Sequence, residues 1–120
     1  MVFAVISDIH GNLESLKAVL EDIESQQVDK ILCLGDIVGY GPDPETCVDL
    51  IKQKCDIIIM GNHDYAVQDF TLGEKFNHHA KIALNWTIAN LSNSAMDFLR
   101  DLPYMINEGD FCFVHATPKE

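Results

Sequence analysis

Positive charge is scarce in this sequence: eight lysine and arginine residues stand against 19 aspartate and glutamate residues, giving a formal net charge of −11. A chain with this balance repels a phosphate backbone unless cations intervene. Composition therefore gives no strong nucleic-acid-binding signal, and most of the acidic residues must belong to a solvated surface.

Long apolar runs, paired cysteines and a signal-like N-terminus are also missing. No apolar run approaches the ~20 residues of a membrane span, and the N-terminus begins with a strand pattern rather than a signal peptide. The four cysteines include no C-x-x-C pair, and Cys33 and Cys112 lie inside apolar runs, where a thiol behaves as a small hydrophobe. Buried reduced cysteine suits a reducing compartment, so we expect a cytoplasmic protein without membrane association.

The 120 residues, 48% apolar and 22% charged, suffice for one modest domain with a core. In the first half, three short apolar runs alternate with two helical patterns. The runs are Val2–Ile6, Ile31–Leu34 and Ile57–Met60, and helices are expected behind Asn12 as N-cap and from Pro44 behind Asp43. This order predicts two successive βαβ units and a parallel sheet. The first run is apolar throughout, which predicts a central strand covered on both faces.

The second half has a different pattern. An amphipathic helix is expected over His78–Leu91, and Ser92 could cap a further short helix. Two strand-like runs, Tyr104–Ile106 and Phe111–Val114, enclose a turn that contains Gly109. The predicted fold class is therefore α/β, with a βαβαβ parallel sheet followed by helices and a β-hairpin.

Each of the three apolar runs ends in polar residues beside a glycine. The residues of metal-ligand type at these ends, and at the end of the predicted hairpin, are Asp8, His10, Asp36, Asn62, His63, Asp64 and His115. Parallel sheets carry their sites at the carboxyl ends of strands, so the three clusters should meet in one cleft.

A mixture of carboxylate, imidazole and amide oxygen suits Mn, Fe, Co, Ni or Zn, and no thiolate lies among the candidates. Each residue alone has an ordinary interpretation: a strand-end Asp is usually a turn former or helix cap, and a lone His a surface residue. The adjacent pair His78 and His79 is best interpreted as a solvated helix start. Three glycine-bounded clusters in order are much harder to explain in this way, and a metal requirement would account for part of the acidity.

The motifs Asp8-x-His10, Gly35-Asp36-(x)2-Gly39 and Gly61-Asn62-His63-Asp64, with His115 at a later strand end, resemble those of the calcineurin-like metallophosphoesterases. The run GDIVGYGP over residues 35–42 is most similar to the small bacterial and archaeal phosphodiesterases. The resemblance implies an α/β/β/α sandwich of which this chain supplies the N-terminal part. It also implies a hydrolase acting on a phosphodiester or phosphomonoester.

The resemblance further implies a role for each ligand-type residue. Asp8 and His10 would bind a first metal ion, Asp36 would bridge two, and Asn62 and His115 would bind the second. His63 would face the substrate phosphate as hydrogen-bond donor or general acid. Two divalent ions, Mn most favoured, would then hold a bridging hydroxide as nucleophile.

Two positions depart from the phosphoprotein phosphatases of this superfamily. Gly39 stands where those enzymes have an Asp, and Tyr40-Gly41 stands where they have Arg-Gly, so phosphoprotein dephosphorylation is disfavoured. Asp64 has two interpretations that the sequence leaves open: it orients His63, or it caps the short helix that follows.

The Gly-His-x-His motif that closes the family's site late in the chain is not found in this sequence. We therefore expect residues 1–120 to be one C-terminally incomplete metallophosphoesterase domain with weak or absent activity. The alternative is a non-catalytic metal-binding or interaction module derived from such an enzyme. Apolar faces left uncovered would favour self-association. The sequence names neither the phosphoester substrate nor the native metal.

Overall fold

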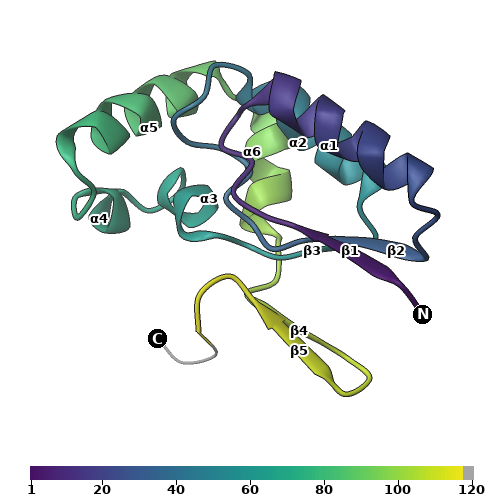
Figure 1. The fold of residues 1–120 in the computed structure, drawn as a ribbon. Helices are drawn as coiled ribbons and strands as arrows, with labels where there is room; N and C mark the ends of the chain where they lie inside the picture. The colour runs from purple at the N-terminus through teal and green to yellow at the C-terminus, as the bar shows by residue number, and fades with distance from the viewer. Residues whose placement is uncertain (118–120) are drawn as a thin grey trace.

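The computed structural model of the chain describes residues 1–117. Over these residues, three parallel strands form one sheet and two antiparallel strands form a separate hairpin (Figure 1). The strands are β1 (Phe3–Ile6), β2 (Lys30–Cys33), β3 (Ile57–Ile58), β4 (Met105–Glu108) and β5 (Phe111–Val114). The helices are α1 (Leu13–Ser25), α2 (Pro44–Lys54), α3 (Asn62–Ala66), α4 (Phe70–Gly73), α5 (His78–Asn90) and α6 (Asn93–Arg100). The predicted α/β class, with a βαβαβ sheet, helices and a hairpin, is confirmed.

Local sequence explains where the principal helices begin. The Asn12 side chain accepts a hydrogen bond from the Ser15 amide at 3.1 Å, and Ser92 Oγ accepts one from the Ala95 amide at 3.1 Å. Both caps satisfy amides that have no partner within the first helical turn. Helix α2 begins at Pro44 as predicted, although Asp43 makes no side-chain cap hydrogen bond.

The sheet has the order β1-β2-β3 with parallel pairing throughout. Helices α1 and α2 lie over one face, and the hairpin lies on the other side (Figure 1). Phe3 of β1 contacts the rings of Phe111 and Phe113 with centroids 6.3 and 6.4 Å apart. The Lys30 ammonium also pairs with the Glu108 carboxylate, so the hairpin is held against β1 and β2 by apolar and ionic contacts.

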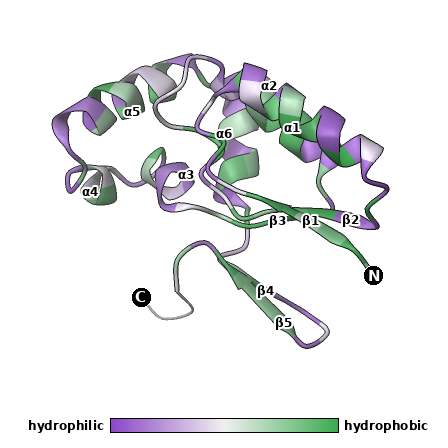
Figure 2. Cartoon of the chain, in the orientation of Figure 1, coloured by the Kyte–Doolittle hydropathy of each residue, from purple (hydrophilic) through white to green (hydrophobic). Residues whose placement is uncertain are grey.

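The buried core lies between the helical layer and the sheet. It includes Leu16 of α1, Ile51 of α2 and Leu99 of α6, each at most 2% exposed. Figure 2 shows the strands mostly apolar and the helices alternating between apolar and polar residues. No helix over residues 1–117 combines the length and the apolar character that crossing a bilayer requires.

Three details of the predicted elements are wrong. Strand β1 is an edge of the three-stranded sheet, and Val5 is half-exposed, so it is not covered on both faces. Strand β3 ends at Ile58, because the chain turns toward the polar cluster, although the Ile59 amide still bonds to the Cys33 carbonyl at 2.9 Å. Helix α4 was not expected, since four residues are too few for a helical period to show.

Candidate metal centre

The loops that follow β1 and β2 are joined by backbone hydrogen bonds beyond the strand ends. The amides of Asp8, His10 and Gly11 donate to the carbonyls of Gly35, Asp36 and Ile37 at 2.9, 2.8 and 2.8 Å, respectively. The parallel pairing of the sheet therefore continues into the polar clusters. This places Asp8 and His10 beside Asp36, as their positions at neighbouring strand ends predicted.

The Asp64 carboxylate holds the β2 and β3 loops together. It is fully buried and accepts hydrogen bonds from the amides of Asp36, Ile37, Val38 and Gly61 at 2.8, 2.9, 3.2 and 3.0 Å. Burial raises the pKa of Asp64 to about 6, although the amides of Gly61, Val38 and Asp36 favour the ionised form. All four donors are N–H groups, so the carboxylate is ionised at neutral pH. These contacts match the capping interpretation of Asp64 and extend it to a second loop.

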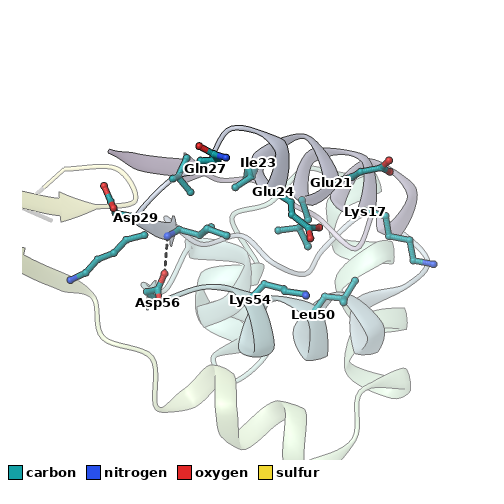
Figure 3. A pocket seen from close by; sticks show the side chains of 13 residues that line it. Lys17, Glu21, Ile23, Glu24, Gln27, Asp29, Leu50, Lys54 and Asp56 are labelled. Atoms are coloured by element: carbon teal, nitrogen blue, oxygen red, sulfur yellow. Dashed lines mark hydrogen bonds between the residues drawn. The ribbon is translucent and has the colours of Figure 1, made fainter. Parts of the chain in front are cut away.

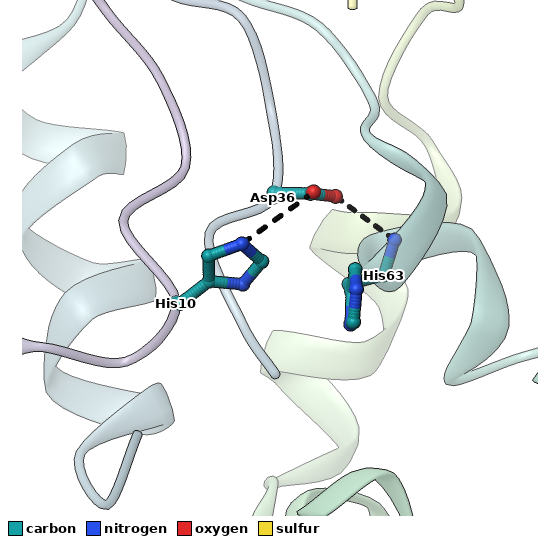
Figure 4. A group of neighbouring side chains, drawn as sticks. All are labelled: His10, Asp36 and His63. Atoms are coloured by element: carbon teal, nitrogen blue, oxygen red, sulfur yellow. Dashed lines mark hydrogen bonds and ion pairs between the residues drawn. The ribbon is translucent and has the colours of Figure 1, made fainter. Parts of the chain in front are cut away.

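Asp36 lies at the centre of the ligand-type side chains and is 3% exposed. Its Oδ1 accepts a hydrogen bond from the His63 amide at 2.9 Å. Its Oδ2 lies 3.2 Å from Nε2 of His115 and 3.7 Å from Nε2 of His10. Figure 4 shows the carboxylate between His10 and the backbone of His63. One carboxylate thus connects all three strand ends and the hairpin.

His10 and His115 are oriented by backbone carbonyl groups. Nδ1 of His10 lies 3.1 Å from the Val38 carbonyl, and Nδ1 of His115 lies 2.7 Å from the Leu34 carbonyl. A carbonyl can only accept, so each Nδ1 must carry the proton. In a neutral imidazole the Nε2 lone pair then points at Asp36. Nitrogen lone pairs directed at a carboxylate repel it unless a cation lies between them, which is the arrangement of metal-binding histidines.

Two groups of three ligand atoms lie within 4.8 Å of one another over residues 1–117. One joins His10, Asp36 and His63, and the other joins Asp8, Asp36 and His115. Asp36 belongs to both, as a bridging ligand would. Carboxylate and imidazole ligands without thiolate fit the divalent metals expected from the sequence.

The two groups combine the residues differently from the ligand sets predicted for the two metal ions. Asp8 Oδ1 lies 3.4 Å from His10 Nε2, yet Asp8 falls in the group that contains His115, and His63 joins His10. Asn62 is exposed at the first position of α3, next to His63. Its role as a ligand stays a prediction.

His63 is held by ring contacts. Its imidazole stacks on Phe76 with centroids 4.4 Å apart and meets the His10 ring edge-on at 4.9 Å. Nδ1 of His63 is buried and has no hydrogen-bond partner among the described residues. Burial lowers the pKa of His63, against the opposing effect of the Asp36 carboxylate. A buried imidazole nitrogen without a partner is unusual in a folded protein and is typical of a functional site.

Glycine is required at two points of contact in this site. A Cβ on Gly39 would lie 2.6 Å from Nδ1 of His63, and a Cβ on Gly61 would overlap the Asp36 carboxylate. Gly39 also has a φ of 95°, in the region that favours glycine. These two residues let the loops approach the imidazole and the carboxylate closely.

Backbone strain is concentrated at the same strand ends. Asp8, His10 and Asp36 have φ values of 59°, 49° and 57°. Such left-handed conformations cost a non-glycine residue on the order of 1 kcal/mol or more and persist only where the surroundings fix them. Here the hydrogen bonds between the loops and the Asp64 carboxylate fix the backbone.

Sequence reasoning missed two members of the site. Phe76 lies far along the chain from His63, and no local pattern connects the two. Tyr40 was noted only as a departure from a related motif, but its ring lies 5.2 Å from that of His10 and 5.1 Å from that of His63. The expectation for His78 and His79 is confirmed, since both are exposed at the start of α5.

A hollow of about 590 Å³ lies elsewhere, between α1, α2 and the segment before β2 (Figure 3). Asp29 and Asp56 line this hollow and directly precede β2 and β3. The hollow therefore lies at the amino ends of these strands, opposite the metal-ligand cluster. Its lining mixes Lys17 and Lys54 with Glu21 and several other acidic residues. Neither group of three ligand atoms lies there. We therefore place the candidate site at the carboxyl ends of the strands.

Comparisons with known proteins identify the family of the chain and several relatives. The model of the calcineurin-like phosphoesterase family matches residues 1–118. An uncharacterised protein of Methanocaldococcus jannaschii is 46% identical over 98% of this chain and 50% of its own length. The symmetrical bis(5'-nucleosyl)-tetraphosphatase of Dechloromonas aromatica is 31% identical over 97% of this chain and 44% of its own length.

A solved structure shows the same arrangement of elements. The crystal structure of a metallophosphoesterase from Sphaerobacter thermophilus has a TM-score of 0.78 and 41% identity, covering 93% of this chain and 45% of that one. A putative diadenosine tetraphosphatase has a TM-score of 0.65 and 25% identity, covering 88% of this chain and 49% of its own. The chain spans about half the length of the curated relatives that it matches.

Proposed function

The chain belongs to the calcineurin-like phosphoesterase family, and we propose that it forms one side of a metal-dependent phosphoesterase site. The observation that carries the proposal is the approach of two imidazole Nε2 atoms to one buried carboxylate oxygen, at 3.2 and 3.7 Å. Both rings are held in this orientation by backbone carbonyls. With neutral rings, the Nε2 lone pairs repel the carboxylate oxygen unless a cation lies between them.

Asp36 would bridge two divalent ions, with His10 and His115 donating Nε2 and with Asp8 and Asn62 as further ligands. Mn is the favoured metal, and Fe, Co, Ni or Zn also suit the ligand types. When bound, the ions would supply a strong water-derived nucleophile and neutralise charge on the phosphoryl group. Asp64 would keep the ligand loops in place without contacting the substrate.

His63 would act on the phosphate as a hydrogen-bond donor or general acid. Its Nδ1 is buried against Gly39, so Nε2 is the atom that would hold or move the proton. Stacking on Phe76 fixes the plane of the ring. Burial favours the neutral imidazole, so proton donation by His63 would depend on the nearby carboxylates.

Each ligand group contains three residues, fewer than the four to six ligands that these metals usually take. The chain also spans about half the length of its curated relatives. We therefore propose that the isolated chain binds metal weakly and hydrolyses phosphoesters slowly.

The proposal is tested by calorimetric titration of the purified chain with Mn²⁺. We expect saturable binding that Asp36→Asn abolishes or weakens at least about tenfold, because a shared carboxylate ligand is lost. Asp49→Asn is the matched control, since Asp49 is exposed on α2 and lies in neither ligand group.

Hydrolysis of bis(p-nitrophenyl) phosphate with Mn²⁺, measured on the same samples, separates the two candidate roles. Metal binding with slow turnover supports the phosphoesterase site, and metal binding with no turnover on any phosphoester favours the non-catalytic module. Absence of Mn²⁺ binding, or equal binding by wild type and Asp36→Asn, would reject the metal centre.

A further inference from the structure

Tyr40 is an exposed aromatic side chain beside the ligand cluster. It is 51% exposed, while its ring lies 5.2 Å from the His10 ring and 5.1 Å from the His63 ring. The His10 contact is edge-on at 81°, and the His63 contact is tilted at 43°. Neither contact covers the Tyr40 ring in parallel stacking, so much of its surface is open to a ligand.

The backbone holds Tyr40 in this position at a cost. Tyr40 has a φ of 68°, in the left-handed region that non-glycine residues rarely adopt. The next residue, Gly41, donates its amide to the His10 carbonyl at 2.8 Å, and a Cβ on Gly41 would overlap the backbone of His10 and Gly11. The Tyr40 segment is thus fastened to the loop that carries the candidate metal ligand. Strain of this sort at a ligand cluster points to a functional role.

Structural roles for Tyr40 fit these observations poorly. A ring that is half-exposed contributes little to the core, and its hydroxyl has no hydrogen-bond partner among the described residues. A glycine, which has no Cβ, would avoid the strain. The remaining role is contact with a molecule that occupies the site.

We propose that Tyr40 is a specificity-determining residue that stacks on a planar aromatic group carried by the alcohol part of the bound phosphoester. The inference rests on the proposed function, because the phosphate must lie at the ligand cluster for the ring to be reached. Aryl phosphates and nucleoside phosphates both supply such a group. Aromatic stacking tolerates different rings, because each presents a π-face.

The test measures binding rather than turnover, so it does not require an active chain. Phenyl phosphate, thymidine 5'-monophosphate, methyl phosphate and ribose 5-phosphate are titrated by calorimetry into the chain saturated with Mn²⁺. We expect wild type to bind the two aromatic ligands about 10- to 100-fold more tightly than their non-aromatic counterparts. Preference confined to one aromatic ligand supports the inference and identifies the source of the ring.

Three variants assign the preference to Tyr40. Tyr40→Leu should reduce the ratio of the affinities for aromatic and non-aromatic ligands to less than about threefold. Tyr40→Phe should keep the wild-type ratio, because stacking needs the ring and not the hydroxyl. Val19→Leu, at an exposed position of α1, is the control for surface substitution. The Mn²⁺ isotherm and the circular dichroism spectrum verify that each variant is folded.

Several outcomes overturn the inference. If wild type binds all four phosphates with equal affinity, the proposed role of Tyr40 is rejected and the proposed function is unaffected. This outcome is measured on wild type alone, so it does not require Tyr40→Leu to fold. Equal weakening of all four ligands by Tyr40→Leu would show that Tyr40 only positions His10 and His63. If no phosphate binds in the presence of metal, the proposed function and this inference both fail.

Discussion

At the scale of single residues, the site depends on a carboxylate that does not belong to either ligand group. Asp64 is buried under the loops and accepts four backbone amides, two from each oxygen. By fixing the backbone of Asp36 and Gly61 together, it sets the distance between two strand ends. A sequence motif can show that an Asp is present here, but not which amides it will accept.

Replacing Asp64 by Asn tests this role. The amide group can accept at only one of the two oxygen positions, so two buried N–H groups would face an NH₂ group. We expect Asp64→Asn to lower the free energy of unfolding by about 2–4 kcal/mol, measured by urea denaturation, and to weaken Mn²⁺ binding. Asp49→Asn, at an exposed position, should change stability by less than about 0.5 kcal/mol. Unchanged stability in Asp64→Asn would contradict the role of its four hydrogen bonds.

The cysteines allow a second prediction at this scale, because only the thiolate reacts with disulfide reagents. Burial raises the pKa of Cys33 to about 12, of Cys47 to about 11 and of Cys55 to about 12. Thiolate at these positions forms only as the pH approaches those values. Cys112 is exposed.

With a disulfide reagent at pH 8, we expect one thiol to react quickly and three only after denaturation. Cys112→Ser should remove the fast phase, and Cys47→Ala should leave it intact. A fast phase that persists in Cys112→Ser would show that one of the other three thiols is accessible.

At the scale of elements, the positions at which helices begin agree closely with those predicted from the sequence. The positions at which strands end agree less well. The caps Asn12 and Ser92 act within three residues, so the local sequence is sufficient to predict them. Strand β3 was expected to continue to Met60, but it ends where the chain must turn to bring Gly61 against Asp36. That turn depends on the neighbouring strand, which the local sequence does not encode.

Ser92 offers a test of one such element. Its hydroxyl caps α6 at the Ala95 amide, and its hydroxyl and amide both donate to the Glu45 carboxylate of α2. We expect Ser92→Ala to lower stability by about 1 kcal/mol through loss of the cap, measured as a shift in urea midpoint. Ser94→Ala, at an exposed position inside α6, is the control and should be neutral or slightly stabilising. Equal effects of the two changes would show that the cap contributes nothing.

At the scale of the whole molecule, apolar side chains remain exposed on β1 and the hairpin. Val5 of β1 and Phe111 of β5 are 50% and 61% exposed, and the rings of Phe111 and Phe3 connect the two elements. Apolar groups that share one face favour association, because contact removes them from water.

We predict that the isolated chain self-associates through this face. Sedimentation velocity should show a concentration-dependent increase in mean sedimentation coefficient. Phe111→Thr should reduce the increase, and Val19→Thr, at an exposed position of α1, should not. A monomer at every concentration tested would contradict the prediction.

The sequence by itself determined the α/β order of elements, the helix caps Asn12 and Ser92 and the polar residues at three strand ends. These features depend on neighbours within a few positions or on the rule that parallel strands end at one edge. The tertiary structure decided what each side chain contacts. The carbonyls that orient His10 and His115, the three amides of residues 36–38 on Asp64 and the stacking of His63 on Phe76 join residues 13 to 81 positions apart in the chain. Contacts over such separations arise only when packing brings the elements together, so no local pattern could have predicted them.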